Sequence, residues 1–127
     1  MKDNALHILA KALERAGNIE FAYVFGSRAK EKVFPQSDID IAAYMKPDSL
    51  NLDNELSLHA ALARDLGADN IDLLILNRAR NLILLDEIVR HGKVVFDGNL
   101  SLRRDFEFRV LHDAIDFKYQ RKVFAGR

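Results

Sequence analysis

The most constraining feature of this chain is a Gly-Ser pair between two apolar runs, followed ten residues later by an Asp-Ile-Asp triplet. The pair is Gly26-Ser27, and the triplet is Asp38-Ile39-Asp40. The runs on either side, 21–25 and 39–44, are rich in β-branched and aromatic residues, which predicts two strands. A Gly-Ser pair at a strand end exposes backbone N–H groups and a hydroxyl, and both suit phosphate oxygens.

The two aspartates of the triplet are spaced so that they point to the same face of a strand. Residues i and i+2 of a strand share one face, so Asp38 and Asp40 lie together. Two neighbouring carboxylates are costly unless a cation joins them, and Mg²⁺ is the usual cation. A lone Asp-x-Asp more often marks a solvated polar face. The upstream Gly26-Ser27 and the basic segment between the motifs favour a metal site beside a nucleoside triphosphate.

A third aspartate opens the next apolar run. Asp72 is the only polar residue in the run 71–76, and a carboxylate in an apolar strand needs a reason to be there. We interpret it as a third metal-side carboxylate, on the side of an incoming hydroxyl whose proton it accepts. The alternative is that Asp72 merely ends the loop 67–70.

Apolar periodicity divides the rest of the chain into alternating helices and strands. It predicts helices over 4–16, 54–66, 80–91 and 100 to about 124, and strands over 19–25, 37–44, 70–76 and 93–96. Asp53 is a possible N-cap of the second helix. The alternation predicts an α/β class in one domain, 1–127, with strand order left open.

Composition excludes several classes of function. Nineteen basic and nineteen acidic residues give zero formal net charge, which argues against a direct nucleic-acid partner. Without cysteine there is no disulfide, thiolate zinc site or cysteine nucleophile. We expect a cytoplasmic protein, because the N-terminus has no signal-peptide pattern and no apolar run approaches the roughly 18 residues of a membrane helix.

The predicted C-terminal helix carries two apolar stripes. Phe106, Val110, Ala114 and Phe117 form one, and Phe108, Leu111, Ile115 and Tyr119 form the other. An ordinary surface helix buries one stripe. A second stripe indicates a contact surface for a partner, although the helix could instead simply pack across its own sheet.

The stretch from Gly26 to Asp40, with Asp72 on a later strand, resembles the signature of the nucleotidyltransferase superfamily. That signature is Gly-Ser, about ten residues, Asp-x-Asp, and a third carboxylate further on. With its short length, the chain resembles a minimal nucleotidyltransferase (MNT), with a core over 1–97 and a C-terminal helix over about 100–124. The resemblance implies a polymerase β-like fold: a small mixed sheet flanked by helices.

The resemblance also implies a function. Many such proteins are antitoxins of HEPN/MNT pairs, which transfer AMP from ATP to a tyrosine of a HEPN RNase toxin. It assigns Asp38, Asp40 and Asp72 to catalysis and to Mg²⁺, with two ions expected, and Gly26, Ser27, Arg28 and Ser37 to the nucleotide. Two alternatives stay open: transfer to a small molecule such as an aminoglycoside, and an antitoxin that neutralises by binding alone.

Overall fold

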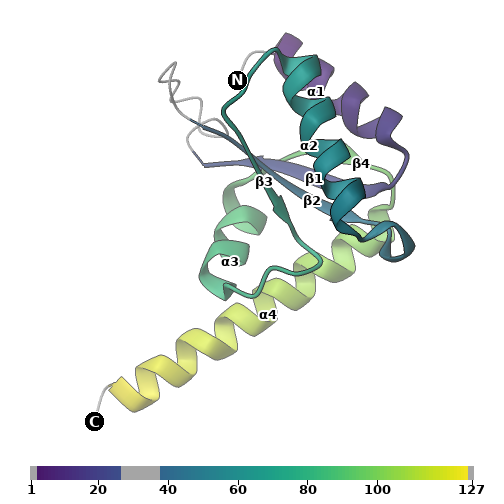
Figure 1. Ribbon diagram of the computed structural model, residues 1–127. Coiled ribbons are helices and arrows are strands. Elements are labelled where there is room, and N and C mark those ends of the chain that lie inside the picture. Colours follow the sequence, from purple (N-terminus) through teal and green to yellow (C-terminus); the bar gives the residue numbers. More distant parts are fainter. Residues whose placement is uncertain (1–2, 27–37, 126–127) are drawn as a thin grey trace.

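The computed structural model describes residues 3–26 and 38–125 (Figure 1). Their elements confirm the predicted alternation, and no predicted boundary is more than two residues from the observed one. In chain order they are α1 (Asp3–Ala16), β1 (Ile19–Phe25), β2 (Ile39–Met45), the 3-10 turn η1 (Pro47–Ser49), α2 (Leu52–Leu66), β3 (Ile71–Ile75), α3 (Leu82–His91), β4 (Lys93–Asp97) and α4 (Leu100–Ala125).

The four strands form one mixed sheet in the order β3-β2-β1-β4. Strand β1 runs antiparallel to both of its neighbours, and β2 runs parallel to β3. Both β2 and β3 therefore begin at the edge of the sheet where β1 ends. This confirms the mixed sheet that the resemblance implied, and it supplies the strand order that the sequence left open.

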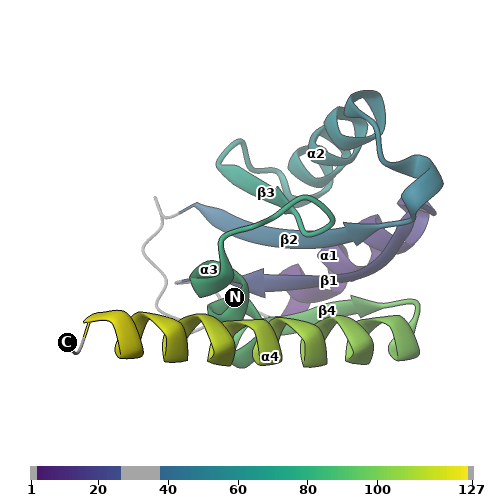
Figure 2. The same cartoon turned by 90° about the horizontal axis from the view of Figure 1, so that it is seen from below.

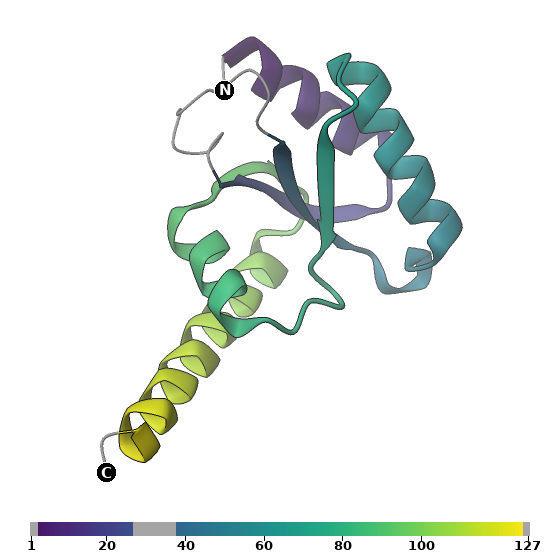
Figure 3. The same ribbon diagram turned by 60° about the vertical axis from the view of Figure 1, so that its left-hand side comes forward.

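Helices cover both faces of the sheet (Figures 1 and 3). Helices α1 and α2 pack on one face, around Leu13, Val24, Ile41 and Leu62. Helices α3 and α4 pack on the other, where buried residues include Tyr23 and Ile88. Because both faces are covered, the interior strands are apolar almost throughout, with four consecutive buried residues in β1.

Helix α2 begins two residues earlier than predicted, and the predicted cap is wrong. Asn51 is the N-cap, and its side chain accepts a hydrogen bond of 2.8 Å from the backbone N–H of Asn54. Asp53 lies in the first turn of the helix, where its negative charge suits the helix dipole. The predicted end at residue 66 is confirmed, since Gly67 caps the helix at φ +63°.

Helix α4 packs against the sheet through three members of the first of its two predicted stripes. Phe106, Val110 and Ala114 are buried, whereas Phe117, the fourth member, is exposed. The Tyr23 hydroxyl of β1 donates a hydrogen bond of 2.7 Å to Glu107. The C-terminal end of α4 extends past the sheet (Figure 2). Over the residues described, no helix is both long enough and apolar enough to span a bilayer.

Candidate active site

The three predicted aspartates lie at one edge of the sheet. Asp38 directly precedes β2, Asp40 is the second residue of β2, and Asp72 is the second residue of β3. The parallel register pairs Asp40 with Asp72, so their side chains emerge side by side from neighbouring strands about 4.8 Å apart. They emerge on the face that α3 and α4 cover, because Ala42, two residues along from Asp40, packs there.

The Gly26 corner lies against Asp40 of this pair. Strand β1 ends where β2 begins, and Phe25 is the register partner of Asp40. Gly26 has φ +72°, and a Cβ atom placed on it would lie 2.4 Å from Oδ2 of Asp40. Glycine is therefore needed here for two reasons: a left-handed backbone conformation and a carboxylate pressed against the main chain.

Electrostatics set Asp40 apart from an ordinary surface carboxylate. Burial raises its pKa, and the nearby carboxylates of Asp72 and then Asp38 raise it further. Within residues 3–26 and 38–125, none of the three aspartate side chains accepts a hydrogen bond or forms an ion pair. The site thus concentrates negative charge that a cation would stabilise.

These side chains suit a hard divalent cation by type. Mg²⁺ prefers carboxylate oxygens and usually keeps several of its waters, so one or two protein carboxylates per ion suffice. In the part of the chain that the structure describes, no group of three or more His, Cys, Asp or Glu side chains is already gathered as a ready-made metal cage. The site therefore offers the right ligands, with Asp40 and Asp72 in register, rather than a closed cage.

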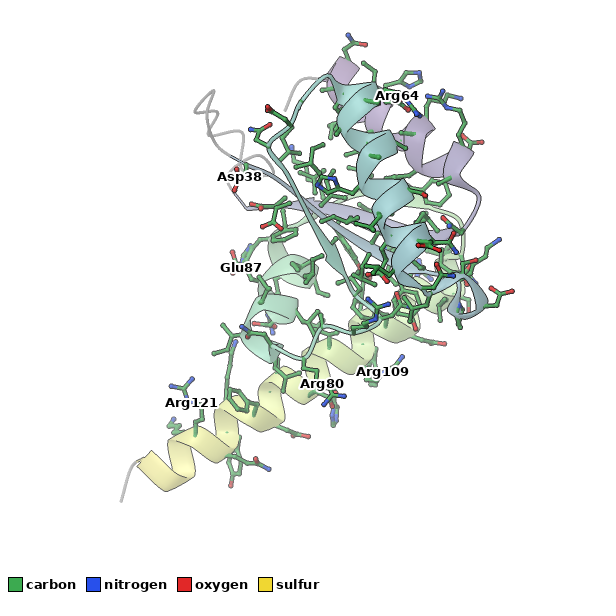
Figure 4. The ribbon with its side chains drawn as sticks, viewed as in Figure 1. Asp38, Arg64, Arg80, Glu87, Arg109 and Arg121 are labelled. Atoms are coloured by element: carbon green, nitrogen blue, oxygen red, sulfur yellow. The ribbon has the colours of Figure 1, made fainter. Side chains whose placement is uncertain are left out.

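The other predicted nucleotide contacts lie outside the described residues. Ser27, Arg28 and Ser37 fall in the segment 27–37, so only Gly26 of the predicted phosphate-binding group has a described position. Figure 4 shows Asp38 on the same side of the molecule as Glu87 of α3.

One buried acid was missed by the sequence interpretation. Asp86 of α3 is the one buried charged side chain among the described residues. It accepts hydrogen bonds of 2.7 Å from Arg90 and 2.8 Å from Lys118 of α4. The hydrogen bond from Lys118 is the main cause that lowers the pKa of Asp86. The local signal was an acid inside an apolar helix, four residues before an arginine.

Solved structures with this architecture exist. The chain is similar to one in "Crystal structure of the toxin-antitoxin with AMP-PNP", with 23% identity, 95% of each chain covered and a TM-score of 0.77. It is also similar to a chain in the tri-AMPylated Shewanella oneidensis HEPN toxin in complex with MNT antitoxin, with 22% identity, 99% and 97% covered and a TM-score of 0.73. A third, in the MntA-HepT toxin-antitoxin, has 22% identity, 98% and 97% covered and a TM-score of 0.72.

These similarities show that the chain shares its fold with the solved structures. In this chain, the fold consists of the sheet order β3-β2-β1-β4 and the long last helix described above. No curated protein sequence is detectably similar to the chain. The family model described as "Polymerase beta, Nucleotidyltransferase" matches residues 8–101, which include Gly26 and all three aspartates. The chain belongs to the polymerase beta nucleotidyltransferase family.

Proposed function

We propose that this nucleotidyltransferase transfers AMP from ATP to a hydroxyl of a HEPN-family toxin, a tyrosine by preference, and thereby acts as an antitoxin. The observation that carries the proposal is the in-register pair Asp40 and Asp72 beside Gly26, on a nucleotidyltransferase fold. Similar chains occur in a toxin-antitoxin structure with an ATP analogue and in a complex with a tri-AMPylated HEPN toxin, which supports both ATP and a protein acceptor.

The chemistry requires the acceptor oxygen to replace pyrophosphate on the α-phosphorus of ATP. The new bond joins the acceptor oxygen to the α-phosphorus, and the bond from that phosphorus to the oxygen bridging to the β-phosphate breaks. Pyrophosphate leaves with the electron pair. The acceptor hydroxyl loses its proton, and we assign Asp72 to receive it because this residue lies at the far side of Asp40 from the Gly26 corner.

We assign the remaining residues to holding the reactants. Asp38, Asp40 and Asp72 would hold Mg²⁺, with two ions expected, and bound Mg²⁺ would supply charge stabilisation for the phosphates and the leaving pyrophosphate. The Gly26 backbone N–H, with Ser27, Arg28 and Ser37, would hold the outer phosphates. The close approach of Gly26 to Asp40 would then bring the phosphate contact and the metal ligands together.

Labelled ATP tests the proposal. The chain is incubated with α-³²P-ATP and Mg²⁺, with and without a purified HEPN-family toxin. We expect label on the toxin, loss of label with Asp38→Ala plus Asp40→Ala, and loss of label when EDTA removes the metal.

Two other outcomes would contradict the proposal. If the double variant still inhibits the toxin as well as the wild type does, the chain neutralises by contact alone. If ATP is consumed only when an aminoglycoside is added, the acceptor is a small molecule.

A further inference from the structure

The second apolar stripe of α4 faces solvent. It consists of Phe108, Leu111, Ile115 and Tyr119, and we call it the exposed stripe. Phe108 is 71% exposed, Ile115 is 57% exposed and Tyr119 is 67% exposed, whereas Leu111 is half-buried. It lies opposite the buried Phe106, Val110 and Ala114, so packing against the chain's own sheet does not account for it. Large apolar side chains aligned on one helix mark an interaction surface.

We propose that the exposed stripe docks an amphipathic helix of the protein that accepts AMP. This inference rests on the proposed function, since it names where the acceptor of that reaction binds. It identifies the surface of this chain that the acceptor contacts and the kind of acceptor segment that binds there. The nucleotidyltransferase site specifies neither.

The direction of α4 links the exposed stripe to the catalytic edge. The centre of the Phe106 ring of α4 lies 5.4 Å from that of the Phe21 ring of β1, and Glu107 accepts a hydrogen bond from Tyr23, which is further along β1. Helix α4 therefore advances in the same sense as β1, which ends at Gly26. Figure 2 shows the C-terminal end of α4 at the end of the sheet where β1 finishes and β2 begins. A partner on the exposed stripe thus sits on the catalytic side.

A hydrogen bond holds the projecting part of α4 in place. Lys118 reaches back to the buried Asp86 of α3, so the helix is fixed beyond its last buried residue, Ala114. Because α4 is already held in this way, it loses little conformational freedom when a partner binds to it.

The extent of the exposed stripe argues against a second copy of this chain. An aromatic side chain buries about 150–250 Å². At about 70% exposure, the two aromatic members would therefore offer roughly 200–350 Å² per chain, and a symmetric dimer on the stripe alone would bury less than the roughly 1,200 Å² of the smallest stable interfaces even with Ile115 added. An acceptor that also contacts the catalytic edge gains the missing area.

Charge at the two ends of the exposed stripe specifies the partner further. Arg104 precedes the stripe and Lys122 follows it on the same side of the helix, and both are exposed. Neither forms an ion pair with another described residue. At 1.5 Å per residue, they lie about 27 Å apart. The complementary partner is an apolar helical ridge with acidic residues near both ends.

The test uses charge placed in the exposed stripe, with a matched control elsewhere. Phe108→Asp and Ile115→Asp change exposed side chains, so the fold should survive. Leu56→Asp is the control, because Leu56 is 60% exposed but lies on α2, on the opposite face of the sheet. The probe is a purified HEPN-family toxin, and its association is measured by calorimetry without nucleotide.

We expect each stripe variant to weaken association by at least tenfold and to raise the KM for the toxin in AMP transfer while kcat is kept. Binding of an ATP analogue should not change, and Leu56→Asp should behave as the wild type. Association unchanged in both stripe variants would overturn the proposal. So would a wild-type dimer in free solution that the stripe variants convert to a monomer, because the occupant would then be a second copy.

The same measurements separate this inference from the proposed function. If the wild type binds the toxin through the stripe but transfers no AMP, the proposed function fails and the docking surface stands. If AMP is transferred and the stripe variants transfer it with an unchanged KM, the docking surface fails and the function stands.

Discussion

Asp40 and Asp86 are two aspartates on the same side of the sheet with opposite surroundings. Asp86 is buried and accepts hydrogen bonds from Arg90 and Lys118, which lower its pKa. The pKa of Asp40 is raised by burial and by the carboxylates of Asp72 and Asp38. Folding satisfies the charge of Asp86 and leaves that of Asp40 uncompensated within the described residues. The difference separates a carboxylate that joins two helices from one positioned to bind a cation.

The difference between Asp40 and Asp86 is tested most directly by removing one charge at a time, starting with Asp40→Asn. We expect AMP transfer to the HEPN toxin to fall by about three orders of magnitude or more, because a metal ligand is lost. The metal-free protein should keep or gain thermal stability, since repulsion from Asp72 and Asp38 is relieved. Thermal melting in EDTA and the labelled-ATP assay measure the two effects. A variant that unfolds would show that Asp40 is structural.

Gly26→Ala tests whether the position of Asp40 matters as much as its charge. Alanine at φ +72° costs about 1–2 kcal/mol of stability, and its Cβ would push the Asp40 carboxylate aside. We expect activity to fall at least tenfold. Gly67→Ala is the matched control, because Gly67 has φ +63° with nothing within 4 Å of an added Cβ. It should lose similar stability by urea unfolding and keep its activity; equal activity losses would contradict the role of Gly26.

Asp86→Asn should lower stability and leave activity almost unchanged, which is the converse of the pattern expected for Asp40→Asn. We expect it to lower the free energy of unfolding by about 1–2 kcal/mol, at the low end for hydrogen bonds between charged groups because Arg90 and Lys118 are about half exposed. The kcat for AMP transfer should stay within about twofold of the wild type, because the hydrogen-bond partners of Asp86, Arg90 and Lys118, are not proposed catalytic residues. Urea unfolding and a full kinetic titration measure the two quantities. A large loss of kcat with normal stability would place Asp86 in the catalytic machinery.

The sequence predicts some parts of this comparison better than others. Local patterns predicted the four α-helices and the four strands, because apolar periodicity marks them and a glycine follows each of α1, α2 and α3. The motif spacing predicted that Asp38 and Asp40 share a face, and the structure places both at one sheet edge. The pairing of Asp40 with Asp72 depends on parallel register between strands separated by α2, and no local pattern encodes it.

The features that the sequence did not predict depend on contacts between segments that are far apart in the chain. The close approach of Gly26 to Asp40 follows from the β1–β2 register, so the sequence could suggest a phosphate contact but not this packing. The Asp86–Arg90 pair is local and could have been found, whereas Lys118 lies 32 residues further along the chain. The two stripes of α4 were visible in the sequence, and only packing shows which of them is buried.

The smallest expected effect is a difference in how the two aspartates make stability depend on pH. The folded-state pKa of Asp40 is raised, so its contribution is complete below the unfolded-state value of about 3.9 and is lost as the pH rises through the folded-state pKa. The folded-state pKa of Asp86 is lowered, so its contribution is complete above about 3.9 and is lost as the pH falls through the folded-state pKa.

Urea midpoints in EDTA, taken from about pH 3 to pH 7 for the wild type and the two asparagine variants, measure both contributions. We expect the stability of the wild type relative to Asp40→Asn to fall as the pH rises above about 4. Its advantage over Asp86→Asn should be constant at neutral pH and shrink below about pH 4. Saturating Mg²⁺ should abolish the first trend and leave the second, because of these two aspartates only Asp40 is proposed to bind the ion. Parallel curves for the two variants would mean that both carboxylates have the same surroundings and would remove the distinction between them.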